Sequence, residues 1–431
     1  MTEGHRWTFR QRFRRGAFGW RSQPAIKRVK EAVSEIRAAR RHDPELAAEG
    51  AVLLLEKISP ALENVDSSSG AIGTAVNRAI DELVPIIIAA AGDRDAHQRR
   101  LERLWQAHMD DEIPYIEALG ERWGELCASP EVASTWADLT ADTLRSTWGG
   151  GPGPRPFFKG TSACLSSLYA AGRYDEVLGL LDLAPTTIWA WEQWAVRSLV
   201  ALGRKAEALQ RAEAARGSYA SPTAIARACE KILLSSGLVD EAYRRFAFDA
   251  HRTTTYLATF RAVCKAYPDK DPREILMDLA ATTPGEEGKW FAAAKDAGLR
   301  DLALELAATS PTDPRTLSRA ARDLAATDPV FAVGAGLAAL HWLLEGHGYE
   351  ITSADVHVAL DHTLGAAEIA GRPDETRRSI LSMIENAGGA DGFVGGILAR
   401  RLAGRPHQRT DLPSGDLLDL LARELRGRRG S

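Results

Sequence analysis

The stretches AGRYDEV at residues 171–177, LGRKAEA at 202–208 and SGLVDEA at 236–242 decide the fold of this chain. In each of them a glycine follows an apolar segment, and an acid and a small or apolar residue then open the next segment. The glycines Gly172, Gly203 and Gly237 lie 31 and 34 residues apart, which is the period of a two-helix repeat. The spacing therefore predicts helical hairpins that stack on one another.

The same positions carry a resemblance to tetratricopeptide-type (TPR) helical repeats. In that family a glycine ends the first helix, an aromatic or apolar residue follows at the second place, and a small residue opens the second helix. Two glycines match the pattern fully: Gly172 with Tyr174 and Val177, and Gly237 with Val239 and Ala242. Gly203 with Ala208 matches except for Lys205 at the aromatic place. Two weaker matches are Gly298 with Asp301 and Ala303, and Gly371 with Asp374 and Thr376. The resemblance covers residues 160–385 and implies an irregular α-solenoid of TPR-like hairpins, with room for one degenerate repeat between Gly237 and Gly298.

The whole chain also resembles an uncharacterised family of bacterial all-helical proteins. The resemblance is carried by VDSSSGAIGTAV at residues 65–76, TYLATFR at 255–261 and TPGEEGKWFAAAKD at 283–296. It implies an all-α fold and brings no activity with it.

Apolar residues recur at helical spacing well before the repeats. Ile26, Val29, Val33 and Ile36 form one stripe. A second helix is predicted to begin after Asp43-Pro44 and to end at about Leu62, and further helices are predicted at residues 71–91, 96–108, 112–127 and 130–148. The run GGGPGP at 149–154 cannot continue a helix and indicates a domain boundary. We therefore expect four segments: a basic aromatic arm at 1–23, an N-terminal helical bundle at 24–148, the repeats at 155–387, and a capping helix (417–425) with a basic tail within 388–431.

Composition places the chain among ordinary globular proteins. Of 431 residues, 45% are hydrophobic and 26% are charged, so a disordered chain is not expected. The best apolar run, 83–91, is too short to cross a bilayer and contains Pro85. The start of the chain lacks the apolar core of a secretory signal. The four cysteines form no C-x-x-C pair, which favours free thiols over a disulfide framework or a zinc site. We expect a cytoplasmic protein.

Positive charge is concentrated at the start of the chain. Residues 1–41 hold twelve Lys or Arg against three acids, a net of +9, so the rest of the chain carries −13. The arm interleaves five aromatic residues with Arg6, Arg10, Arg12, Arg14, Arg15 and Arg21. Guanidinium groups bind phosphates and stack on rings, so the arm can bind nucleic acid. Alternatively, Phe13, Phe18 and Trp20 pack against the first helices while the arginines stay in water.

Two tryptophan-rich stretches are the candidate partner-binding sites. Trp189, Trp191 and Trp194 precede Arg197, and Lys289-Trp290-Phe291 precedes Lys295. Exposed Trp and Arg on the concave side of a solenoid are typical binding anchors. We therefore predict a partner site at Trp191, Trp194, Arg197, Trp290 and Lys295. The alternative is that the first three tryptophans fill the junction between the bundle and the repeats.

Catalytic and cofactor motifs are not found in the sequence. It has no phosphate-binding G-x-x-x-x-G-K-S/T loop, no H-E-x-x-H and no G-x-S-x-G. His357 and Asp361 stand four residues apart and share a helix face, whereas His362 points elsewhere, so we predict no metal there. We expect a non-enzymatic scaffold or adaptor without a cofactor. The alternatives are a nucleic-acid-associated regulator and a helical enzyme with an unrecognised site.

Overall fold

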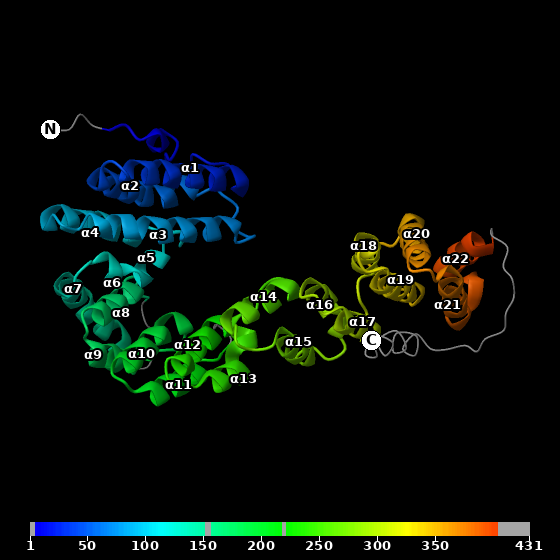
Figure 1. Cartoon of the computed structure of the whole chain (residues 1–431). Coiled ribbons are helices and arrows are strands. Elements are labelled where there is room, and N and C mark those ends of the chain that lie inside the picture. The colour runs from blue at the N-terminus through cyan, green and yellow to red at the C-terminus, as the bar shows by residue number, and fades with distance from the viewer. Residues whose placement is uncertain (1–4, 151–156, 218–220, 404–431) are drawn as a thin grey trace. The chain divides into compact units, whose positions relative to one another are not determined.

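The computed structural model describes residues 5–150, 157–217 and 221–403. Across these residues the chain forms 22 α-helices and three 3-10 helices and contains no strand (Figure 1). The predicted all-α class is confirmed. None of the helices in these three ranges is long and apolar enough to cross a membrane.

The chain divides into two compact units, Met1–Ala242 and Tyr243–Ser431, and the division falls within α13 (Val239–Ala250). The glycine- and proline-rich run at 149–154 therefore belongs to the first unit. The four-segment division drawn from the sequence stays a prediction.

Four of the five helices predicted between residues 44 and 148 lie close to their predicted bounds. The described elements up to residue 150 are η1 (Thr8–Gln11), α1 (Ser22–Arg40), α2 (Pro44–Leu62), α3 (Ala71–Ala89), α4 (Arg94–Met109), α5 (Ala118–Glu121), α6 (Trp123–Leu126) and α7 (Pro130–Gly149). The side chain of Asp43 accepts a hydrogen bond from the amide of Leu46 and so caps α2 directly before Pro44. The apolar stripes of α1, α2 and α3 meet in one buried core.

The helix predicted at 112–127 is wrong, because two short helices, α5 and α6, replace it. Asp111 is buried and accepts hydrogen bonds from the amides of Tyr115 (3.3 Å) and Ile116 (2.9 Å), which bends the chain before α5. Between α5 and α6, Ser166 Oγ donates to the carbonyl of Glu121 at 3.0 Å and accepts from the amide of Gly124 at 2.9 Å. A side chain from a later helix thus supplies hydrogen bonds that a continuous helix would make internally.

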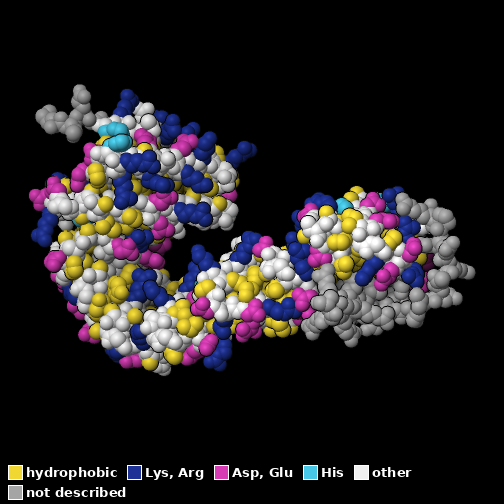
Figure 2. Space-filling model, viewed as in Figure 1, with side chains coloured by type: hydrophobic (Ala, Val, Ile, Leu, Met, Phe, Trp, Pro, Cys, Tyr) yellow, Lys and Arg dark blue, Asp and Glu magenta, His cyan; other side chains and the backbone are white. Residues whose placement is uncertain are grey.

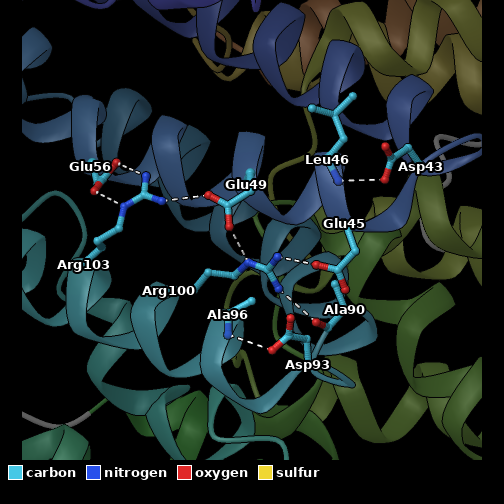
Figure 3. A network of polar contacts seen from close by, with 10 residues as sticks. All are labelled: Asp43, Glu45, Leu46, Glu49, Glu56, Ala90, Asp93, Ala96, Arg100 and Arg103. Carbon is cyan, nitrogen blue, oxygen red and sulfur yellow. Dashed lines mark hydrogen bonds and ion pairs between the residues drawn. The ribbon is translucent and has the colours of Figure 1, made fainter. Parts of the chain in front are cut away.

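Two arginines of α4 join it to α2 (Figure 3). Arg100, whose side chain is 3% exposed, donates to Glu49 at 2.7 Å, to the Ala90 carbonyl at 2.9 Å and to Glu45. Arg103 donates to Glu49 at 2.8 Å and binds both carboxylate oxygens of Glu56, at 2.8 and 2.7 Å. Burial disfavours the charge of Glu49, but hydrogen bonds from both arginines outweigh that effect and lower its pKa.

Six helices complete the first unit. They are α8 (Thr161–Ala170), α9 (Tyr174–Leu181), α10 (Trp189–Ala201), α11 (Lys205–Ala214), α12 (Pro222–Leu234) and α13. The predicted glycines Gly172, Gly203 and Gly237 stand between the two helices of each successive pair. The small or apolar residues expected five positions after them, Val177, Ala208 and Ala242, are fully buried. Small side chains at these places let paired helices approach closely.

The described part of the second unit contains nine further α-helices. They are α14 (Tyr256–Ala266), α15 (Pro272–Ala281), α16 (Phe291–Asp296), α17 (Arg300–Thr309), α18 (Pro314–Leu324), α19 (Pro329–Leu344), α20 (Ser353–Ile369), α21 (Pro373–Asn386) and α22 (Phe393–Ala403), with η2 (Glu287–Trp290) and η3 (Gly389–Asp391). The helices α14 and α15 occupy the interval in which a degenerate repeat was expected. The most apolar of these helices, α19, packs against α17, α18, α20 and α21.

All five predicted repeat glycines end a helix in the same way. Gly172, Gly203, Gly237, Gly298 and Gly371 have φ between +70° and +78°. In each case the next amide donates to the carbonyl five residues earlier: Arg173 to Leu168 (2.9 Å), Arg204 to Leu199 (2.8 Å), Leu238 to Leu233 (3.0 Å), Leu299 to Ala294 (2.9 Å) and Arg372 to Ala367 (2.9 Å). This bond and the left-handed glycine define the Schellman motif.

The sequence did not predict α22. It contains two glycines, Gly395 and Gly396, and its Ile397, Leu398 and Leu402 are buried in the core of the second unit. Packing of an apolar face outweighs the poor helix propensity of glycine here. The predicted capping helix at 417–425 and the basic tail after it lie outside the described residues.

Candidate partner-binding site

The tryptophans of α10 lie mostly inside the protein. Trp194 is 3% exposed, and its ring centroid is 5.6 Å from that of Tyr169. Trp191 is half-buried, with its ring centroid 5.0 Å from that of Trp148 of α7. The expectation that Trp194 is an exposed anchor is therefore wrong. Its burial fits the alternative in which these tryptophans fill the junction between the first helices and the repeats.

Arg197 is the exposed member of this group. Its guanidinium carbon lies 4.6 Å from the ring centroid of Trp194, and Nη2 donates to Gln193 Oε1 at 3.1 Å. Glu121 of α5 lies near the Gln193 side chain and Arg197. Burial raises the pKa of Glu121, although the Gln193 amide and the positive charge of Arg197 oppose this shift. We call Glu121, Gln193 and Arg197 the α10 polar cluster.

The α10 polar cluster offers a cation, an amide and a carboxyl group beside an aromatic face. Such a combination can bind a polar or charged side chain of a partner. The sequence did not point to Glu121, because nothing in it indicates that α5 lies beside α10.

The second tryptophan stretch does not form the expected surface patch. Trp290 is 3% exposed, its indole N–H donates to Thr283 Oγ1 at 2.9 Å, and its ring centroid lies 4.8 Å from that of Tyr256. The prediction that Trp290 is an exposed anchor is therefore wrong. Lys295 of α16 is partly exposed, and its role in binding stays a prediction.

The aromatic residues of the arm anchor it to the first helices. Trp7, Phe9 and Phe13 are buried in the core formed by α1, α2 and α3, and Phe18 packs against that core. The amide and hydroxyl of Thr8 donate to Glu35 at 2.8 and 2.6 Å, which fixes the arm on α1. Trp20, which was expected to pack with them, is instead 72% exposed.

The arginines of the arm point outward. All six, namely Arg6, Arg10, Arg12, Arg14, Arg15 and Arg21, are exposed. Arg12 pairs with Glu31 at 3.3 Å and Arg15 with Glu63 at 3.6 Å. Nine exposed cations form no ion pair within the described part of the chain, and we call them the basic face: Arg6, Arg10, Arg14, Arg21, Lys27, Lys30, Arg40, Arg41 and Arg78. Figure 2 shows Lys and Arg side chains gathered over α1 to α3.

A metal centre or a reactive thiolate in the described ranges would be built from His, Cys, Asp and Glu side chains. No group of three or more His, Cys, Asp or Glu residues there can hold a metal ion. Asp361 pairs with Arg401 at 3.4 Å, and His362 Nδ1 lies 3.1 Å from Ser318 Oγ. Burial raises the pKa of Cys127 to about 12 and that of Cys164 to about 11, so both thiols stay protonated at neutral pH.

Comparison with models of known protein families and with curated proteins found no match, so the proposals below rest on the sequence and on the geometry described above.

Proposed function

We propose that this chain is a cytoplasmic, non-enzymatic scaffold or adaptor whose TPR-like hairpins stack into an irregular solenoid and bind a protein or peptide partner. The observation that carries the proposal is the recurrence of one helix-ending turn at five predicted glycines. A turn repeated at helical-hairpin spacing is typical of solenoids, and solenoids present extended binding surfaces.

Of the predicted site, Arg197 is exposed, Lys295 is partly exposed and Trp191 is half-buried. Trp194 supports the Arg197 guanidinium from within and is therefore assigned a positioning role rather than a direct contact. Arg197 can form paired hydrogen bonds with a carboxylate of the partner, because its guanidinium presents several donors in one plane.

Affinity purification of the full chain from its own cells, with and without nuclease, tests this proposal. A protein partner should be recovered equally from the nuclease-treated and the untreated sample, and Arg197→Glu should abolish its recovery. Arg145→Glu on the exposed side of α7 is the matched control and should leave recovery unchanged. Equal recovery with Arg197→Glu would assign the partner to another surface. Absence of any protein partner would count against the scaffold itself.

The basic face favours a second candidate, binding of nucleic acid. Its nine exposed cations, none of which pairs with an acid of the described ranges, concentrate positive potential on one end of the first unit. The phosphates of a nucleic acid attract such a surface whatever the base sequence, and added salt weakens this attraction steeply. The exposed ring of Trp20 lies next to Arg21 in the sequence and offers a face on which a base can stack.

Deleting the arm is not a clean test, because Trp7, Phe9 and Phe13 belong to the core. A variant with Arg6, Arg10, Arg14 and Arg21 all changed to alanine keeps these rings in place. With a fluorescent duplex DNA, the slope of log K against log salt should fall by about 3 to 4, roughly 0.9 for each lost phosphate contact. The matched control changes Arg145, Arg204, Arg378 and Arg400, which are also exposed, to alanine. An equal fall in the control would contradict a localised site.

A further inference from the structure

A groove runs between α18 and α20 in the second unit. It encloses about 470 Å³, and its lining includes Ser318 and Arg319 of α18, Leu343 of α19, and Val358 and His362 of α20. The α20 residues Ala354, Val358 and His362 stand four apart and so form one face of that helix. The volume is in the range of pockets that hold a small ligand or a few side chains.

The floor of the groove is apolar. Leu343 and Ala359 are almost fully buried, whereas Val358 is 47% exposed and Ile351 is partly exposed beside it. Covering Val358 would remove apolar surface from water at about 25 cal/mol per Å². An occupant with an apolar side chain gains this contribution.

The rim of the groove carries three arginines, Arg315, Arg319 and Arg322, against two carboxylates, Asp313 and Asp355. Arg315 binds both oxygens of Asp355, at 2.8 and 3.0 Å, and so ties α18 to the start of α20. Arg319, in contrast, bonds only atoms of its own helix, the Arg315 carbonyl (3.2 Å) and Thr316 Oγ1 (3.0 Å). No carboxylate in the described part of the chain pairs with Arg319, which is exposed.

Two further groups add to the polar side. Among the described residues, Arg322 bonds only the adjacent Asp323, at 2.8 Å, and water screens this exposed pair strongly. Ser318, which is 5% exposed, hydrogen-bonds Nδ1 of the His362 ring. The other ring nitrogen of His362, Nε2, has no hydrogen-bond partner in the described ranges. The groove therefore combines an apolar floor with Arg319, Arg322 and the His362 ring on its polar side.

We propose that the α18–α20 groove binds an acidic peptide segment of a partner protein, with a carboxylate on Arg319 and an apolar side chain over Val358. Guanidinium and carboxylate groups match in geometry as well as in charge, because two parallel hydrogen bonds can form. The assignment rests on the proposed scaffold function, to which it adds the chemistry and the place of the partner.

The direct test is a fluorescence-anisotropy titration of the full chain with a synthetic peptide in which Glu and Leu alternate at helical spacing. The same peptide with Lys in place of Glu serves as the charge control. We expect saturable binding of the acidic peptide alone, weakened at least tenfold by Arg319→Glu and also by Val358→Asp. Arg378→Glu on α21 should change nothing, because Arg378, like Arg319, is exposed and among the described residues bonds only atoms of its own helix.

Three outcomes overturn the assignment: no saturable binding, equal binding of the Lys peptide, or equal weakening by Arg378→Glu. Circular dichroism of each variant keeps loss of binding separate from loss of fold. The proposed scaffold is judged separately by the affinity purification. If the full chain captures a partner that Arg319→Glu does not release, the groove assignment fails and the scaffold stands. If the acidic peptide binds as expected but no partner is captured, the scaffold fails and the groove remains a peptide site.

Discussion

The amide of Gly124 in α6 donates a hydrogen bond to Ser166 Oγ in α8 at 2.9 Å. The backbone of α6 therefore contacts a side chain of α8 directly. A Cβ atom at residue 124 would lie 2.2 Å from the carbonyl oxygen of Ser166 and 2.7 Å from the Cβ of Ala170. The first of these neighbours is backbone, so a side chain at residue 124 can fit only if α8 moves.

Gly124→Ala should therefore destabilise the protein by about 1–3 kcal/mol, the usual cost of overpacking a core. Gly179→Ala in α9 is the matched control, because a Cβ there meets nothing within 4 Å. The control should be neutral or stabilise the protein by up to about 1 kcal/mol, since alanine favours a helix more than glycine. Urea denaturation of both variants measures the difference, and equal stabilities would contradict the close approach.

The repeat turns have room for a side chain, but a residue with a Cβ atom should be strained in their left-handed backbone conformation. Gly203 has φ +78° and open space where a Cβ would be. We expect Gly203→Ala to cost about 1–2 kcal/mol, because only the backbone conformation is penalised. Gly203→Asn should cost less, since asparagine adopts this conformation more readily. If urea denaturation finds both variants as stable as the parent chain, the left-handed turn does not limit stability.

The ion-pair network between α2 and α4 should make stability depend on pH in the acidic range. The pKa of Glu49 is lowered from its ordinary value of 4.5 in the folded state, so its contribution is present above that value. The contribution is lost as pH falls below about 4.5 and through the lower folded pKa, because the unfolded chain binds the proton more tightly. Glu49→Gln should flatten the fall in unfolding free energy between about pH 5 and 3. Glu102→Gln, at an exposed position of α4, should leave it unchanged.

A buried histidine should add a second pH dependence nearer neutrality. His108 is 1% exposed, and burial lowers its pKa from 6.5 despite a hydrogen bond with the Lys159 carbonyl. The unfolded chain then binds a proton below about pH 6.5 that the folded chain does not, so stability should decrease as pH falls through this range.

His108→Gln removes the titrating group and keeps an amide that can reach the Lys159 carbonyl. The slope of unfolding free energy between about pH 5 and 6.5 should become shallower in this variant. His42→Gln, at an exposed position, should leave the slope as it is. An unchanged slope in His108→Gln would mean that the histidine is protonated in the folded protein.

Local patterns were sufficient for most of the helices. Pro44, preceded by Asp43, predicted the start of α2, because the proline suits a first turn and the carboxylate caps it. The glycines from Gly172 to Gly371 predicted turns that the structure forms, because only glycine adopts a left-handed conformation at little cost. Both signals depend on residues only a few positions apart, so they can be recognised from the sequence alone.

Exposure and long-range contacts were decided by the tertiary structure. Trp194 and Trp290 looked like surface anchors, yet each is buried because a neighbouring helix covers its ring. Ser166 hydrogen-bonds the backbone where the helix predicted at 112–127 is interrupted. The two segments are far apart in the sequence, so local periodicity cannot predict this contact.

The sequence by itself therefore determined the helical class, the repeat turns and the positive charge of the arm, since propensity, glycine stereochemistry and charge belong to single residues or short segments. Only the tertiary structure decided that Glu121 lies beside Arg197, and that Arg319 and Val358 share one groove. Such pairings follow from how helix faces pack, and packing depends on many residues at once.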